Sequence, residues 1–143
     1  MIESEEILNH KEAAKMKKLI PILVLVVLTL ACLVGCSKYT SRYSAVLLIS
    51  TGTSKAGSIS FTSFSGTKVF KLKSSGQLNY SAELGTGAAT VYYDCNGTKT
   101  QLFSIGAGQK VGPSSIAVTP GTVYVIVETD GKCQDGKFSF DVK

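Results

Sequence analysis

Few residues in this chain have side chains that could carry acid–base or nucleophilic chemistry. The 143 residues include a single histidine, His10, and no tryptophan. From residue 36 onward there is no histidine, which excludes Ser-His-Asp and Cys-His arrangements from that part of the chain. The same part holds six carboxylates: Glu83, Asp94, Glu128, Asp130, Asp135 and Asp141. The sequence therefore predicts no catalytic residues and no enzyme activity.

The carboxylates suggest two other kinds of site. Asp130 and Asp135 share a short segment and could ligate calcium, but the segment lacks the dense oxygen ligands of a calcium loop, so turn formation is favoured. Asp94 could form a carboxylate pair with Glu128 or Asp130, although no pattern in the sequence brings them together. Two cysteines without histidine cannot complete a zinc site. We therefore predict no metal and no cofactor.

A long apolar stretch stands near the N-terminus. Lys17 and Lys18 precede an apolar run that ends at Cys36, after which the chain becomes polar. A positive start, a short apolar stretch and a small residue before the break are typical of a secretory signal peptide, which takes no part in the fold. Its last four residues, Leu33-Val34-Gly35-Cys36, resemble the lipobox of bacterial lipoproteins.

The lipobox resemblance implies a diacylglycerol on Cys36, cleavage between Gly35 and Cys36, and a mature chain that starts at Cys36. It thereby implies contact with a membrane through this lipid, on the extracytoplasmic side of a bacterial cell envelope. Two lipid chains anchor a protein stably, because each buried CH₂ contributes about 0.8 kcal/mol. The alternatives are a soluble secreted protein and an uncleaved membrane anchor, although the apolar run is short and has Pro21 near its start.

Residues 1–15 make a poor start for a signal peptide, because they carry four acidic residues. Met16-Lys17-Lys18 makes a good one. We therefore expect translation to begin at Met16, with residues 16–35 as the signal peptide and residues 36–42 as a lipidated tether. The alternative for 1–15 is an amphipathic helix, for which Ile7, Leu8 and Ala14 provide only a weak apolar stripe.

Two of the four cysteines remain for other roles. Cys32 would leave with the signal peptide and Cys36 would carry lipid, which leaves Cys95 and Cys133. A disulfide between them would close a loop of about 39 residues and stabilise the fold by roughly 3–4 kcal/mol in the chain-entropy model. Because exported proteins meet oxidising conditions, we expect this bridge; the alternative is two free thiols.

The part of the chain from residue 36 onward is basic, with 11 basic and 6 acidic residues and a net charge of +5. Arg42 is its only arginine, and no nucleic-acid-binding motif accompanies the lysines, so we expect no nucleic-acid partner. Proximity to anionic lipid is a more natural use of this charge. Tyr39 and Tyr43 are candidates for contact with the membrane interface. Tyr92 is a candidate for stacking on a sugar or anchoring a protein.

Strand patterns fill the chain from residue 43 to residue 143. Residues 77–84 and 137–143 alternate polar and apolar, and 122–128 is apolar on both faces, as in a central strand. Further candidate strands are 43–49, 58–64, 68–72, 89–95, 100–105 and 115–118. Turn signals separate the candidates at 65–66, 74–76, 85–87, 96–97, 106–108, 120–121 and 130–131. Eight or nine short strands at this spacing predict an all-β fold, an antiparallel β-sandwich.

Glycine-flanked strands recur from Lys68 onward, in residues 70–72, 76–80, 121–127 and 136–140. In these residues the chain resembles pre-peptidase C-terminal domains, small jelly-roll sandwiches found beside bacterial extracellular enzymes and in surface lipoproteins. The resemblance implies a sandwich of the same kind over about half of the chain.

These observations predict a membrane-anchored surface lipoprotein whose β-sandwich, residues 43–143, is a non-catalytic binding or envelope-associated module. Its partner would be a glycan or a protein of the envelope. The alternative is an inhibitor or immunity-type lipoprotein that blocks an external protein. The sequence does not identify the ligand-binding residues.

Overall fold

The computed structural model describes Pro21 and residues 38–143. The predicted start at Met16, the cleavage site at Gly35 and the lipidation site at Cys36 lie outside the described residues. No helix in the described part is long and apolar enough to cross a membrane. Residues Tyr39–Lys143 form one compact unit, which begins four residues before the predicted boundary at Tyr43.

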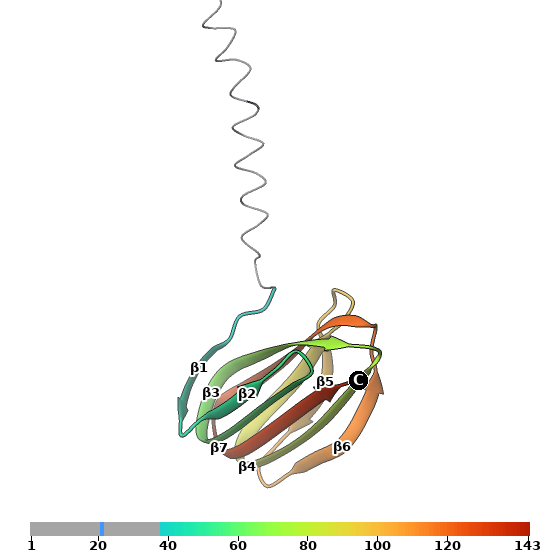
Figure 1. The fold of residues 1–143 in the computed structure, drawn as a ribbon. Coiled ribbons are helices and arrows are strands. Elements are labelled where there is room, and N and C mark those ends of the chain that lie inside the picture. The colour runs from blue at the N-terminus through green and yellow to red at the C-terminus, as the bar shows by residue number, and fades with distance from the viewer. Residues whose placement is uncertain (1–20, 22–37) are drawn as a thin grey trace, which may run out of the picture. The chain divides into compact units, whose positions relative to one another are not determined.

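Seven antiparallel strands make up this unit (Figure 1). They are β1 (Arg42–Val46), β2 (Ile49–Gly52), β3 (Ala56–Ser74), β4 (Gln77–Asp94), β5 (Thr100–Ile105), β6 (Lys110–Ala117) and β7 (Gly121–Val142). The strand order is β1-β3-β7-β4-β5, while β2 also pairs with β3 and β6 also pairs with β4. The all-β antiparallel fold predicted from the sequence is therefore confirmed.

Three of the strands are much longer than predicted. β3, β4 and β7 contain 19, 18 and 22 residues, and each replaces two of the short strands expected. The turns predicted at 65–66, 85–87 and 130–131 were wrong, because the strands continue through these positions. Gly66 and Gly87, at φ 128° and 94°, lie where the register shifts. Glycine tolerates such backbone in a bulge as readily as in a turn.

These irregularities let the long strands pass from one layer of the sandwich to the other. One layer contains β2, the first half of β3, the second half of β7, the first half of β4, and β6. The other contains β1, β5 and the remaining halves of the long strands. A Cβ on Gly57 would lie 2.4 Å from the ring of Phe70, so the two halves of β3 face each other. The result is a jelly-roll-like β-sandwich whose layers share three strands.

Alternation along the strands decides which side chains enter the core. The side chains buried in agreement with the predicted pattern are Leu78, Ala82, Leu84, Phe138, Phe140 and Val142. β7 lies between β3 and β4, and its Ile126 is buried on the face opposite Val125 and Val127. This confirms that 122–128 is a central strand. Full burial of each large apolar side chain contributes about 1.5–3 kcal/mol.

The edge formed by β1 and β2 has a bend at the same level as its neighbouring strands. β1 and β2 keep a single register along β3, interrupted only at two residues. One of these is Leu47, with φ 49°, and on the other side of β3 lies Asp135 of β7, with φ 51°. Both are level with Thr62 of β3, where ladder pairs are skipped. The bend therefore crosses three neighbouring strands, and it leaves Leu47 76% exposed.

Candidate binding surfaces

The first residues of the compact unit are held on the sandwich by Tyr39. Its hydroxyl donates a hydrogen bond to Asp94 Oδ2 at 2.7 Å, and its ring contacts Tyr124 with 5.3 Å between centroids. Asp94 is 2% exposed, and its Oδ1 also accepts the N–H groups of Asn96 and Gly97, at 3.2 and 2.7 Å. Of the predicted tether, only residues 36–38 therefore precede the compact unit.

The carboxylates are not brought together. Asp94 lies opposite Tyr124 in the ladder, four residues from Glu128 and six from Asp130, so the carboxylate pair considered from the sequence does not form. Asp130 and Asp135 are exposed positions of β7. Among the residues that the structure describes, no three His, Cys, Asp or Glu side chains come close enough to hold a metal ion.

Cys95 and Cys133 are free thiols, so the predicted disulfide is not formed in the structure. Cys95 follows Asp94, which pairs with Tyr124, whereas Cys133 lies nine residues further along β7. Nine residues of extended strand span about 30 Å, and a disulfide requires Cα atoms within about 7 Å. The ladder register, which spacing in the sequence does not reveal, keeps the two cysteines apart.

The Cys133 thiol is buried next to β4. Its Sγ donates to the carbonyl of Ala88 at 3.2 Å. Burial raises the pKa of this thiol, the hydrogen bond to Ala88 lowers it by less, and the charge of Asp130 raises it further. Less of this thiol is therefore thiolate at a given pH than in an ordinary cysteine.

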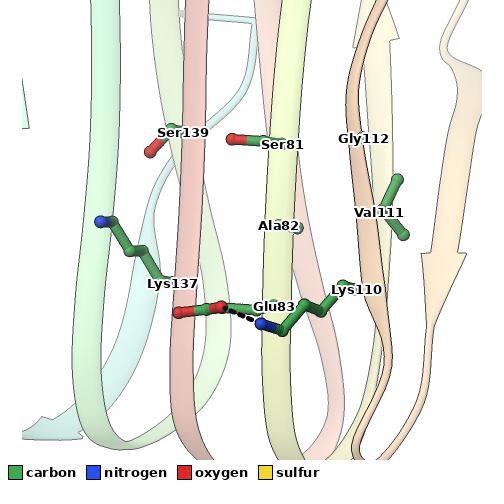
Figure 2. Close-up of a pocket in the computed structure, with 8 residues that line it drawn as sticks. All are labelled: Ser81, Ala82, Glu83, Lys110, Val111, Gly112, Lys137 and Ser139. Carbon is green, nitrogen blue, oxygen red and sulfur yellow. Dashed lines mark ion pairs between the residues drawn. The ribbon is translucent and has the colours of Figure 1, made fainter.

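A shallow pocket lies on the outer face of one layer (Figure 2). It has a volume of about 240 Å³. Its lining residues are Ser81, Ala82, Glu83, Lys110, Val111, Gly112, Lys137 and Ser139. Tyr80 and Ala82 of β4 pair with Ser114 and Val111 of β6, so β6 has an extra residue opposite Ser81. The bulge lies at the pocket, because Ser81 and Gly112 of the bulge both line it.

Charged residues of three strands meet in the pocket. Glu83 of β4 is the ladder partner of both Lys110 on β6 and Lys137 on β7. Lys110 Nζ lies 3.6 Å from Glu83 Oε2, and both side chains are exposed, so the pair contributes at most about 1 kcal/mol. A second pocket shares Glu83 and Lys110 and continues to Gln109 and Asp135. We call the two pockets together the polar groove.

The chemistry of the polar groove is hydrogen bonding and charge. Its first pocket offers one carboxylate, two ammonium groups and the hydroxyls of Ser81 and Ser139. No aromatic side chain lines either pocket, so the groove has no platform on which a sugar ring could stack. These residues carry no signal in the sequence, because their outward strand positions are typical of ordinary solvated surface.

Tyr92 is half-buried and covered by a neighbouring side chain. Lys99 Nζ lies 4.3 Å from the centroid of its ring and also pairs with Glu128 on β7. The ring that was a candidate for sugar stacking is therefore occupied by a lysine of the same chain.

A second surface lies along one edge of the sheet, where β1, β2 and β3 are neighbours. We call this surface, formed by residues 38–76, the cationic flank. It contains six basic residues and no acidic one: Lys38, Arg42, Lys55, Lys68, Lys71 and Lys73. Residues 77–143 contain five lysines and all six carboxylates. The net charge of the whole domain does not reveal this separation, although the order of the charged residues along the sequence shows it.

The cationic flank also exposes large apolar side chains. Within the described part of the chain, the exposed large hydrophobic residues are Tyr43 (42%), Val46 (57%), Leu47 (76%) and Ile49 (70%). All four come from seven consecutive residues of the edge. The ring of Tyr43 stacks on buried Phe64, with 5.2 Å between centroids. Positive charge and exposed apolar surface therefore occur on the same side of the sandwich.

The sequence matches no protein-family model and no curated protein. Among solved structures, the chain is similar to a cupin superfamily protein from Desulfitobacterium hafniense, with 12% identity, a TM-score of 0.30, and coverage of 79% of this chain and 86% of that one. It is also similar to the GH26-CBM35 β-(1,4)-mannanase of Podospora anserina, with 15% identity, a TM-score of 0.35, and coverage of 69% and 27%.

A third similar structure is the C-terminal CBM6 of LamC, a marine laminarinase from Zobellia galactanivorans. It has 9% identity and a TM-score of 0.33, and the match covers 70% of this chain and 98% of that one. Likenesses this distant carry no functional information.

Proposed function

We propose that this chain is a lipid-anchored protein of a bacterial cell envelope, whose β-sandwich is a non-catalytic binding module. The observation that carries the proposal is the start of the compact unit at Tyr39, three residues after the lipobox cysteine Cys36. Because Tyr39 is hydrogen-bonded to buried Asp94, a lipid on Cys36 would hold the sandwich at the membrane surface without a long linker.

The polar groove supports a binding role. Its exposed carboxylate, ammonium and hydroxyl groups can recognise a polar partner, and its lack of aromatic side chains favours a protein segment over a stacked glycan. An inhibitor or immunity-type lipoprotein would use the same surface. The likeness to pre-peptidase C-terminal domains stays a prediction.

The anchor is tested by intact-mass analysis of the membrane fraction from bacteria that express the full chain. We expect a protein that begins at Cys36 and carries lipid. The variant Cys36→Ser should lose the lipid and remain unprocessed, whereas the control Cys32→Ser should be processed normally. An unlipidated chain in the soluble fraction would contradict the proposal.

The binding role is tested on an array of envelope proteins and glycans. A single tight protein partner would indicate an inhibitor, and retained glycan would indicate a glycan-binding module. We expect Glu83→Ala to weaken binding, whereas Lys132→Ala, an exposed position of β7 outside the groove, should not. Equal binding by both variants would exclude the groove.

A further inference from the structure

We propose that the cationic flank is the membrane-facing side of the sandwich. In this arrangement the edge formed by β1 and β2 lies on an anionic lipid surface, with the side chains of Val46, Leu47 and Ile49 at the boundary between headgroups and acyl chains. The inference rests on the proposed lipid anchor, and it adds which side of the domain touches the bilayer.

The distribution of charge supports this orientation. The flank has six basic residues and no acidic residue, whereas the rest of the described chain has one more acidic than basic residue. Each Lys or Arg close to an anionic leaflet raises the membrane-binding constant about fivefold. Because the attraction falls off within a Debye length of about 8 Å, it acts only on the side that faces the lipid.

The exposed apolar side chains support the same side. A soluble surface gains nothing from Leu47 at 76% and Ile49 at 70% exposure, but an interfacial surface combines such residues with lysines and arginines. The bend at Leu47 places Val46 and Ile49 on either side of it along the edge. Tyr43 presents an amphipathic ring of the kind enriched at membrane interfaces.

The reach of the predicted tether is compatible with this orientation. Tyr39 contacts Tyr124 of β7, whose ladder partner is Lys71 of the flank, one strand away or about 5 Å at the usual strand spacing. The three residues from Cys36 to Tyr39 span at most about 11 Å. A lipid on Cys36 could therefore enter the bilayer beside the flank and would keep the flank within range of the lipid charge.

A second copy of this chain is the rival occupant, because β1 and β2 form an unpaired sheet edge. Self-association through this edge would bring two surfaces of six basic residues each into contact. Like charges placed against each other oppose such a complex. An anionic lipid surface satisfies both the charge and the apolar side chains, so the observations favour it.

The absence of tryptophan makes a direct test possible, since one introduced tryptophan reports alone. We would place it by Leu47→Trp on the flank and, as the matched control, by Ser115→Trp on β6. Both positions are exposed, so neither variant should disturb the core. The lipidated full chain, whose lipid is verified by intact mass, is reconstituted into vesicles of phosphatidylcholine and phosphatidylglycerol with or without brominated acyl chains.

We expect blue-shifted emission from Leu47→Trp that brominated lipid quenches, and neither effect for Ser115→Trp. A lipid-bearing Leu47→Trp protein whose tryptophan emission is not quenched would overturn the orientation and leave the anchor intact. Blue-shifted but unquenched emission would assign the flank to a second copy or another protein, and would also overturn it. A chain without lipid would instead refute the proposed function itself.

Charge variants provide the second measurement. Lys71→Gln and Lys73→Gln, placed in the Leu47→Trp chain, should each lower the ratio of docked to undocked protein about fivefold. Lys110→Gln, on β6, should leave it unchanged. Equal effects of all three substitutions would mean that net charge alone, and not this side of the sandwich, determines the contact.

Discussion

The cationic flank and the side that bears the polar groove share one core, yet their surfaces differ in chemistry. On the flank, positive charge accompanies exposed apolar side chains, and there is no carboxylate. On the other side, carboxylates meet polar or charged partners, as in the pairs Asn79–Asp141 at 2.8 Å and Lys110–Glu83 at 3.6 Å. Packing in the core thus constrains the side chains at inward positions. Side chains at outward positions are not constrained in this way, so their chemistry can differ between the two sides.

The largest expected effect tests whether core aromatic residues on the two sides contribute equally to the free energy of unfolding. Phe64 is fully buried and lies beneath Tyr43 of the flank, so Phe64→Ala should lower the free energy of unfolding by about 3–5 kcal/mol. Phe103, which stacks on Tyr80 with 5.4 Å between centroids, is only partly buried. Phe103→Ala should therefore cost about 1–2 kcal/mol. Urea unfolding with unchanged m-values measures both, and equal losses would remove this difference between the sides.

The next effect concerns the attachment of the N-terminal end. Asp94→Ala leaves the Tyr39 hydroxyl and two backbone N–H groups without their acceptor, and should lower the free energy of unfolding by about 2–3 kcal/mol. Tyr39→Phe should lower it by about 1–2 kcal/mol. In a double-mutant cycle we expect a coupling of about 1 kcal/mol. Additive losses would mean that Tyr39 does not depend on Asp94, and that the tether is longer than three residues.

The smallest effect reports on the environment around the bend of β7. Burial and Asp130 raise the pKa of Cys133, so less of it is thiolate at a given pH and its alkylation should accelerate only at alkaline pH. At pH 8 we expect iodoacetamide to modify half-buried Cys95 about tenfold faster than Cys133, a ratio that corresponds to about 1.4 kcal/mol. Peptide mapping measures the two rates. Resistance of both cysteines until a reductant is added would show that they are bridged, and would contradict their separation along β7.

Much of the fold could be predicted from local patterns. Alternation in 77–84 and 137–143 identified the inward residues, because a strand has a period of two and only one face is buried. The apolar run at 122–128 identified the central strand for the same reason, since both of its faces are covered. These patterns depend only on residues close together in the sequence, so they can be recognised before the partner strands are known.

The features that depend on distant partners could not be predicted. Gly66 and Gly87 indicate positive φ, but whether the chain turns back there depends on β7, which pairs with both β3 and β4. The bond from Tyr39 to Asp94 joins residues 55 positions apart and left no local signal. The sequence shows residues 38–76 as a stretch without acidic residues. That these residues form one edge of the sheet depends on strand pairing, which the sequence does not reveal.

The place of β7 in the sheet has a consequence for the timing of folding. β3 and β4 follow each other along the chain but do not pair; each pairs instead with β7, the last 22-residue strand. A chain that emerges N-terminus first can pair β3 with β1 and β2, and β4 with β5 and β6, but nothing joins these two groups until residues 121–142 have appeared. The single sheet is therefore completed last, by the pairings of β7 with β3 and β4, and the long sequence separation between β3 and β7 makes this step slow.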